Sequence, residues 1–182
     1  MKSVSKILSI IILLALGTKV SAQKYSTEKS TVGFYSHATL EDIKANNTQS
    51  KAIFDVANHS IAFTIPIRDF KFEKSLMQEH FNEKYMESDK FPKSTFQGKM
   101  TGFDINKKGP QQVSATGKMT MHGVTKDVEI PGTVEVVNAS TIHLNSVFAI
   151  KLDEYQIKIP QLLWQKIAEQ VEVKVDFTLI QK

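Results

Sequence analysis

The clearest pattern along the chain is an alternation of apolar and polar residues that recurs in segments of strand length. It is most regular near the C-terminus, where Val171, Val173, Val175, Phe177 and Leu179 are separated by polar residues. Successive side chains of a β-strand point to opposite faces, so this pattern predicts strands with one buried face. The expected strands cover residues 25–38, 49–56, 60–67, 94–105, 111–121, 124–137, 142–150 and 171–179.

Short turns separate most of these segments, which favours a sandwich or a closed barrel over an α/β fold. The strand length favours the barrel. Residues 40–50 are polar and contain Asn46-Asn47, and we interpret them as a loop. Pro131-Gly132 interrupts the segment 124–137 and predicts a bend or bulge there. Without an internal repeat or a long linker, the chain from residue 23 onward is expected to form one domain.

One stretch between two predicted strands has helical spacing instead. Met77, Phe81 and Tyr85 recur every fourth residue and would share one face of a short helix. Ser75 followed by Gln78 has the form of a capping box, and Pro92 ends the pattern. A second short helix is expected after Pro160, with Leu163 and Trp164 on its apolar side.

Three blocks of the chain resemble the YceI-like family and occur in the family's order. They are LMQEHFNEKYMESDKFPKSTFQGK, GKMTMHGVTKDVEI and DEYQIKIPQLLWQKIAEQVEVKVDF. The resemblance covers essentially the whole chain after the N-terminal segment. It implies a mainly β fold, an eight-stranded antiparallel lipocalin-like β-barrel with two short helices, and an apolar ligand in its interior. The implied ligand is a polyisoprenoid or a fatty-acid-like chain.

The barrel interior is therefore the candidate site. Large apolar residues alternate there with Gly98, Gly102, Ala115 and Gly117, and these small residues could leave a channel. Methionine side chains could adapt to a flexible ligand. The alternative is a plain packed core. The expected ligand-binding residues of the interior and the helix plugs are Phe34, Ile53, Phe63, Ile65, Phe72, Met77, Phe81, Tyr85, Phe96, Met100, Met119, Met121, Phe148, Ile150, Leu163 and Trp164.

The two predicted helices could close the ends of a barrel. Their apolar faces would either gate access to the interior or act as fixed plugs, and the sequence favours neither. Polar residues at the rim, such as Arg68, Asp69, His80 and Asp153, could hold a ligand head group.

The N-terminal residues have the pattern of a secretory signal peptide. Lys2 and Lys6 precede the apolar run 7–16, which is too short to span a bilayer, and Val20-Ser21-Ala22 fits a cleavage site. We expect residues 1–22 to be removed and residues 23–182 to be periplasmic or secreted, without a stable membrane anchor. The chain has no cysteine, which excludes both disulfides and a lipid-modified cysteine.

Removal of this segment would lower the net positive charge of the chain. The full chain has 23 Lys and Arg against 19 Asp and Glu, and Lys2, Lys6 and Lys19 would leave with the signal peptide. The remaining balance is close to neutral. No basic cluster with interleaved aromatic residues is present, so the sequence does not indicate nucleic-acid binding.

Catalytic patterns are weak. Glu79, His80 and Glu83 lie close together on the predicted helix, but a metal site normally needs three or four ligands of fixed geometry. There is no Gly-x-Ser-x-Gly elbow, cysteine nucleophile or phosphate-binding glycine loop.

We therefore expect a non-enzymatic protein without metal or cofactor that sequesters an isoprenoid or fatty-acyl lipid. A homodimer is allowed but not required. Two alternatives remain: an envelope stress or structural protein with a packed core, and an enzyme acting at the barrel mouth through Glu79, His80 or Glu83.

Overall fold

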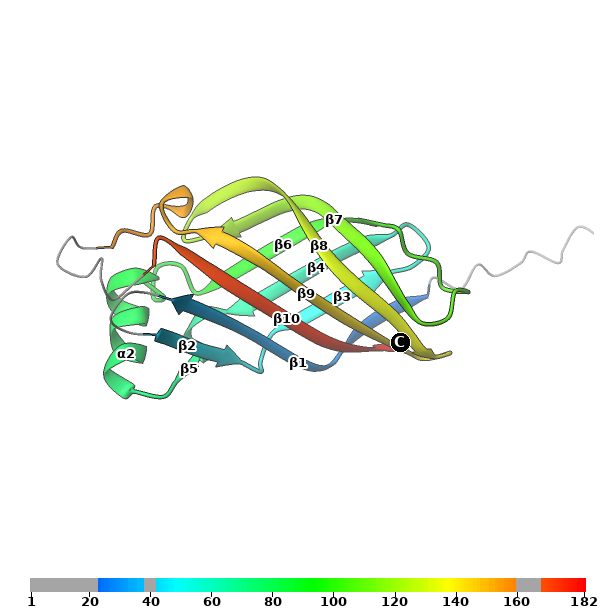
Figure 1. Ribbon diagram of the computed structural model, residues 1–182, viewed down its shortest axis with the longest axis horizontal. Helices are drawn as coiled ribbons and strands as arrows, with labels where there is room; N and C mark the ends of the chain where they lie inside the picture. Colours follow the sequence, from blue (N-terminus) through cyan, green and yellow to red (C-terminus); the bar gives the residue numbers. More distant parts are fainter. Residues whose placement is uncertain (1–22, 38–41, 160–167) are drawn as a thin grey trace, which may run out of the picture.

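The computed structural model describes residues 23–37, 42–159 and 168–182, which form an antiparallel β-structure of long, tilted strands (Figure 1). The short helical elements are the 3₁₀ turns η1 (Ile67–Asp69) and η3 (Asp153–Tyr155), the α-helix α2 (Ser75–His80) and the π-helical turn η2 (Phe81–Tyr85). The strands are β1 (Lys24–His37), β2 (Asp42–Asn47), β3 (Lys51–Asp55), β4 (Ser60–Pro66), β5 (Lys71–Phe72), β6 (Lys93–Thr101), β7 (Pro110–Met121), β8 (Val124–Asn138), β9 (Thr141–Lys151) and β10 (Gln170–Gln181).

The sheet closes on itself because β10 pairs with β1. Neighbouring strands run in the order β1, β3, β4, β6, β7, β8, β9, β10 and back to β1, which is a closed eight-stranded antiparallel barrel. The predicted fold class is confirmed. Closure removes most of the open sheet edges on which other chains could pair; β5 and parts of β8 and β9 stay unpaired on one side.

Strand β2 was not expected, because its sequence is polar. It pairs with the second half of β1, from Val32↔Asn47 to His37↔Asp42, while β3 pairs with the first residues of β1. β2 and β3 thus share one side of β1 with a break between them. The predicted loop over residues 40–50 is wrong for residues 42–47, since hydrogen bonding to β1 can outweigh low intrinsic β-propensity.

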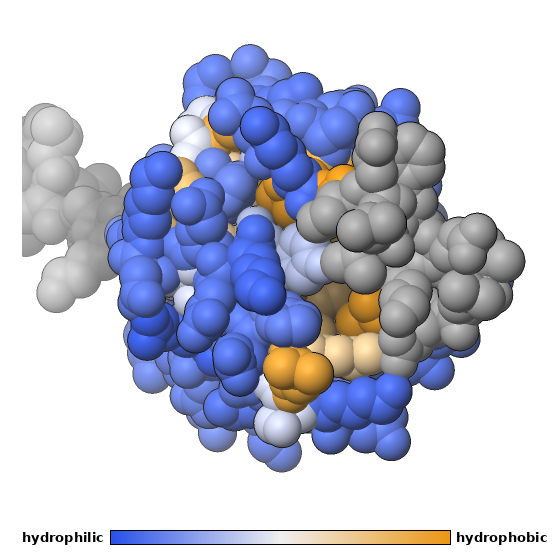
Figure 2. All heavy atoms as spheres, turned by 90° about the vertical axis from the view of Figure 1, so that its left-hand side faces the viewer, coloured by the Kyte–Doolittle hydropathy of each residue, from blue (hydrophilic) through white to orange (hydrophobic). Residues whose placement is uncertain are grey.

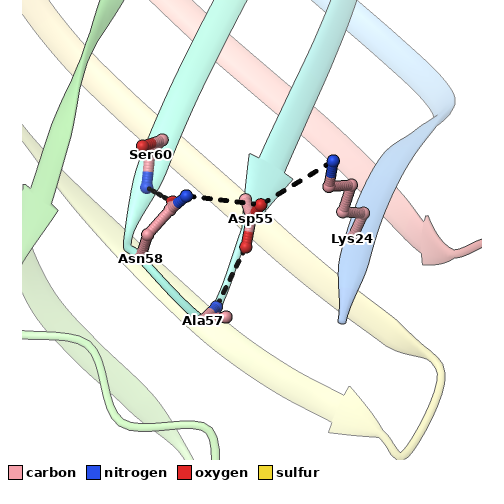
Figure 3. Close-up of polar contacts among 5 residues, drawn as sticks. All are labelled: Lys24, Asp55, Ala57, Asn58 and Ser60. Carbon is pink, nitrogen blue, oxygen red and sulfur yellow. Dashed lines mark hydrogen bonds and ion pairs between the residues drawn. The ribbon is translucent and has the colours of Figure 1, made fainter. Parts of the chain in front are cut away.

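The tight connection between β3 and β4 is stabilised by its own polar side chains (Figure 3). The Asp55 carboxylate accepts hydrogen bonds from the Ala57 amide at 3.1 Å and from Asn58 Nδ2 at 3.5 Å. Asn58 Oδ1 in turn accepts from the Ser60 amide at 2.9 Å. His59 completes the turn with a left-handed φ of 60°. Such side-chain-to-backbone bonds are the reason Asp and Asn favour turns.

The helical segment lies at one end of the barrel, on the left in Figure 1. The predicted capping box is wrong in its details. Lys74 is the N-cap residue and makes no side-chain cap hydrogen bond, whereas Gln78 Oε1 accepts a hydrogen bond from the Phe72 amide at 3.4 Å. Gln78 therefore ties the helix to β5 instead of to its own N-terminus. The second predicted helix, after Pro160, lies outside the described residues.

The pairing between β8 and β9 covers only part of their length. It runs from Asn138↔Thr141 to Thr133↔Asn145, and no backbone pairing between the two strands is recorded for residues 124–132 and 146–151. By contrast, β7 pairs with β8 without a register shift from Pro110↔Glu135 to Met121↔Val124. The bulge predicted at Pro131-Gly132 is thus absent from the β7 side. The change at these residues is instead the end of pairing with β9.

Side chains bridge this partly paired seam. Ser146 Oγ donates a hydrogen bond to the Pro131 carbonyl at 2.5 Å, and Lys126 pairs with Glu154 of η3 at 3.3 Å. The His122 Nδ1 atom lies 3.1 Å from the carbonyl oxygen of Tyr155. Isolated contacts thus join β8 and the turn before it to β9 and η3, where a backbone ladder would normally run.

Candidate functional site

The barrel interior contains a small apolar cavity of about 70 Å³. Among the described residues that line it there is no Asp, Glu, Lys, Arg or His, and their polar atoms come from Ser, Thr and backbone groups. The lining consists of Ile61, Phe63, Ile65, Ser94, Thr95, Phe96, Met100, Val113, Ala115, Met119, Ile130, Pro131, Gly132, Leu144, Ser146, Phe148, Val175 and Phe177.

Six of the predicted site residues line this cavity. They come from four strands: β4, β6, β7 and β9. Two of their aromatic rings pack in the core together with Phe177, since Phe63 lies 5.9 Å from Phe96 and 5.3 Å from Phe177 between ring centroids. The six are Phe63, Ile65, Phe96, Met100, Met119 and Phe148.

Three further predicted residues form an aromatic cluster with Phe70 at the helical end of the barrel. Phe81 of η2 lies 5.5 Å from Phe34 in a stacked arrangement, 5.6 Å from Phe70 and 5.0 Å from Phe72. Phe34 also meets Phe70 and Phe72 edge-on. We call these four rings the phenylalanine cluster. It attaches the helical segment to β1 and β5, as a plug requires.

The remaining predicted residues that the structure describes do not line the cavity. Met77 and Tyr85 are half-buried on the helical segment, and Met121 and Ile150 are buried elsewhere in the core. Ile53 is wrong as an interior residue, because its side chain is 55% exposed while its neighbours Ala52 and Phe54 are buried. On a strand, adjacent residues face opposite sides, so burial of Phe54 places Ile53 outside. Leu163 and Trp164 lie outside the described residues.

The expected channel beside the glycines is also wrong. Gly98 and Gly117 are directly paired across β6 and β7. A Cβ atom added to Gly98 would lie 2.5 Å from the Thr116 carbonyl oxygen and 2.7 Å from the Phe96 ring, and one on Gly117 would lie 2.2 Å from the Gln97 carbonyl oxygen. The two glycines permit a close approach of backbone and ring, so the space is filled.

Two serines on the cavity wall were missed by the sequence reasoning. Ser94 and Ser146 are 7% and 8% exposed, and both line the cavity. The signal was present, since Ser94 stands two residues before Phe96 and Ser146 two residues before Phe148 on the inward face. The predicted site residues are all apolar or aromatic, so they do not include these two serines.

The seam described above lies directly over the cavity. Ile130, Pro131 and Gly132 line it from β8, and Ser146 and Phe148 line it from β9. The wall of the cavity is thus formed in part by strands that are not paired with each other at this level.

The helical end also carries a polar contact between distant segments. His122, in the β7–β8 turn, places Nε2 3.0 Å from a Glu87 carboxylate oxygen, and its side chain is only 10% exposed. Its ring packs edge-on against Phe91, with ring centroids 4.6 Å apart. Through Nδ1 the same ring also contacts a backbone group, the Tyr155 carbonyl. Arg68, proposed for the rim, forms an ion pair with Asp89. Seen from this end, the surface is mostly hydrophilic, with apolar atoms showing in patches (Figure 2).

The candidate catalytic group gains no support. Glu79 and Glu83 are exposed and His80 is half-buried, and among the described residues no hydrogen bond or ion pair joins any two of them. A search of the described residues finds no group of three or more His, Cys, Asp or Glu side chains arranged to hold a metal ion.

The family model of the YceI-like domain matches residues 24–179. The chain belongs to the YceI-like family. The expected family is therefore confirmed, and the match covers the strands that close the barrel except for the last two residues of β10. No curated protein matches the sequence significantly.

Solved structures share the fold at low sequence identity. A polyisoprenoid binding domain from Saccharophagus degradans, described as implicated in plant cell wall breakdown, is 15% identical with a TM-score of 0.76, covering 87% of this chain and 98% of that one. Burkholderia cenocepacia BcnA is 21% identical with a TM-score of 0.67, covering 82% and 95%. The Campylobacter jejuni YceI protein is 18% identical with a TM-score of 0.63, covering 80% and 88%.

Among the described residues of this YceI-like chain, no helix combines the length and apolar character that a membrane-spanning helix requires.

Proposed function

We propose that this YceI-like chain is an exported, non-enzymatic binding protein that holds one long apolar lipid, an isoprenoid or acyl chain, inside its barrel. The observation that carries the proposal is the closed barrel with an interior cavity whose described lining residues include no ionisable side chain. The name of the Saccharophagus degradans neighbour as a polyisoprenoid binding domain supports this ligand class.

Burial of apolar surface is sufficient to drive such binding. Each methylene group removed from water contributes about 0.8 kcal/mol, so a long chain binds without specific polar contacts. Side chains must move to admit it, because a cavity of about 70 Å³ is far below the range of about 300–1,000 Å³ for ligand sites. Met100 and Met119 are suited to this movement, since methionine is unbranched and adapts its shape.

The packed-core alternative has this small cavity in its favour. One experiment separates the two functions. The protein is purified natively after export, extracted with organic solvent, and the extract is analysed by mass spectrometry. A stoichiometric isoprenoid or acyl lipid is expected. An empty extract, together with no thermal stabilisation by added lipids, would favour the packed core.

Export is tested on the same preparation. N-terminal sequencing of the protein recovered from the periplasm or the medium is expected to begin at Gln23. An intact N-terminus on membrane-bound protein would contradict this part of the proposal. Light scattering on the processed protein tests whether it forms a homodimer.

A further inference from the structure

The β8–β9 seam begins at the cavity. The ladder between the two strands ends at the pair Thr133↔Asn145, and residues 124–132 and 146–151, all of them described, do not pair with each other. Over this stretch β8 arches away from β9 (Figure 1). Gly132 and Ser146, the first residues beyond the ladder, both line the cavity. The missing ladder therefore lies in the wall of the candidate site.

Each strand of the seam is nevertheless held on its other side. β8 pairs with β7 as far as Val124, and β9 pairs with β10 as far as Lys151. The two strands thus belong to two separately hydrogen-bonded parts of the sheet. They can move apart over this stretch without breaking any ladder hydrogen bond, which is impossible at a fully paired junction.

The contacts that cross the seam in the described chain are individually weak. Ser146 Oγ donates to the Pro131 carbonyl, and Lys126 forms an ion pair with Glu154 in which both side chains are at least one-third exposed. A single neutral hydrogen bond or an exposed ion pair adds little stability. Opening therefore costs less here than at a paired junction.

The inner side of the seam suits the passage of an apolar chain. Val128 and Ile130 of β8 and Phe148 of β9 are half-buried and pack against the core, and the last two line the cavity. Their neighbours Asp127 and Glu129 are exposed on the outer face. An apolar chain that slides between the strands meets apolar side chains and stays away from these carboxylates.

The sheet is also interrupted beside β5, but there the space is filled. Among the described strands β5 pairs only with β2, and its Phe72 belongs to the phenylalanine cluster. The buried Asn47 Nδ2 of β2 donates to the Pro66 carbonyl at 2.6 Å. Stacked rings and a buried amide make this interruption a poor route to the interior.

We propose that the unpaired part of the β8–β9 seam is a lateral gate through which the apolar chain enters and leaves the barrel. Residues 124–132 of β8 separate from residues 146–151 of β9 about the ladder end at Thr133 and Asn145. The helical segment stays seated as a plug. This inference rests on the proposed function, because it names the route to the same interior site.

A reversible cross-link across the seam tests the gate. Lys126→Cys and Glu154→Cys replace the ion pair at the far end of the seam, and a short bis-methanethiosulfonate joins the two thiols after folding. The ladder already holds the other end, so one bridge clamps the whole stretch. The chain has no other cysteine, and dithiothreitol removes the bridge, so each sample serves as its own reference.

A second ion pair provides the matched control. Lys118 and Asp127 lie 2.9 Å apart across the paired β7–β8 junction, and both side chains are exposed. The Lys118→Cys, Asp127→Cys variant carries the same bridge one residue along β8, on its paired side. This bridge leaves the seam free.

A disulfide at the cavity gives a second lock. A Cβ atom added to Gly132 would lie 3.7 Å from the Ser146 Cβ atom, within the range of about 3.5–4.5 Å for a disulfide. It would also lie 2.9 Å from the Asn145 carbonyl oxygen, so the strand must shift slightly. The reduced form of the Gly132→Cys, Ser146→Cys variant carries the same shift and is the reference.

Stopped-flow fluorescence measures the uptake of two probes, retinol as an isoprenoid and cis-parinaric acid as an acyl chain. Closing either lock is expected to slow uptake about tenfold or more, and reduction is expected to restore it. The control bridge should leave the rate unchanged. Protein loaded before it is locked should also release the probe more slowly, because a gate slows both directions, whereas damage to the binding wall speeds release.

The outcomes separate the gate from the proposed function. If locked and reduced protein take up a probe at the same rate, the seam is not the route, and the proposed function stands because the probe still binds. Equal slowing by the control bridge, or slower uptake together with faster release, would also refute the gate. If neither probe binds the reduced protein, the proposed function fails and the gate fails with it.

Discussion

At the scale of single residues, the inward or outward direction of a side chain decides its role. Met119 lines the cavity, whereas Ile53 is 55% exposed on the outer face. The same substitution at the two positions therefore tests the interior site with a matched control.

We predict that Met119→Glu abolishes lipid uptake, because the carboxylate would be buried in an apolar cavity without a partner. Ile53→Glu is expected to bind lipid as the wild type does, since its carboxylate would be solvated. Displacement of a fluorescent lipid probe by the added lipid measures uptake, and circular dichroism checks that both variants are folded. Equal binding by both folded variants would exclude the interior as the site.

The tyrosines give a second prediction at this scale. The pKa values of Tyr25, Tyr85 and Tyr155 are raised mainly by burial, and that of Tyr35 mainly by its hydrogen bonding with Asp42. These four are all the tyrosines of the chain. A raised pKa means that folding favours the neutral phenol. The resulting contribution to the free energy of unfolding is fully present below pH ~10, the pKa of tyrosine in an unfolded chain. It is lost as the pH rises further.

The tyrosine absorbance near 295 nm is therefore expected to titrate at higher pH in the folded protein than in denaturant. The free energy of unfolding should fall as the pH rises above about 10. Coincident titration curves for folded and denatured protein would contradict the prediction.

Sequence reasoning at this scale succeeded where burial follows a long alternation and failed where it does not. Phe96 and Met100 were placed correctly because β6 alternates over nine residues. Ile53 lies in a strand of five residues beside a break, and a shift of one position exchanges the two faces. Ser94 is not among the predicted site residues because it is polar, although its place two residues before Phe96 puts it on the inward face.

At the scale of elements, the phenylalanine cluster indicates that the helical segment is a seated plug. Phe81 contacts Phe34, Phe70 and Phe72 with ring centroids 5.0–5.6 Å apart. Leu76 lies on the same segment but is 58% exposed, so it provides a control.

Phe81→Ala is predicted to reduce the free energy of unfolding by about 2–4 kcal/mol, somewhat below the cost at a fully buried site. Leu76→Ala is expected to change it by less than about 0.5 kcal/mol. Denaturant titration measures both. If the two variants lose the same stability, the cluster does not hold the plug.

The partly paired seam gives a second prediction for the elements. In β8, alternate amides of residues 124–131 have no β9 partner, whereas β10 is paired on both sides. Amides without a ladder partner open at a lower free-energy cost. Hydrogen exchange followed by NMR should therefore show fast exchange at every second residue of this part of β8. Uniform protection along β8 and β10 would show that the seam is closed in solution.

The seam also marks a limit of sequence reasoning about elements. Pro131 and Gly132 signalled an interruption, and one occurs, but on the β9 side only. Which neighbour loses its pairing depends on the three-dimensional order of the strands. The polar strand β2 escaped prediction for a related reason, because its stability comes from the partner strand β1.

At the scale of the whole molecule, the family and the eight-stranded closure were predictable from sequence, because they depend on blocks and strands distributed over the entire chain. The size of the cavity was not predictable from the sequence. It is set by how Phe63, Phe96 and Phe177 pack against one another, and spacing along the chain does not contain this information.

Loading of the barrel is predicted to stabilise the whole fold. A lipid that binds only the folded state adds about 2.7 kcal/mol at a free concentration of 100 times its Kd. Thermal unfolding of extracted protein with and without the lipid measures the shift. A lipid that displaces the probe without raising the melting temperature would be bound on the outer surface or to unfolded chain.

The small cavity has a consequence for how a loaded molecule could be recognised. With about 70 Å³ of internal space, the empty barrel has no room for a lipid chain unless its side chains move. The change on loading is therefore expected where the wall is least constrained by backbone pairing, at the β8–β9 seam, and where the helical segment lies at the end of the barrel. Any cellular component that distinguishes loaded from empty protein would then have to bind the helical end or the β8–β9 seam.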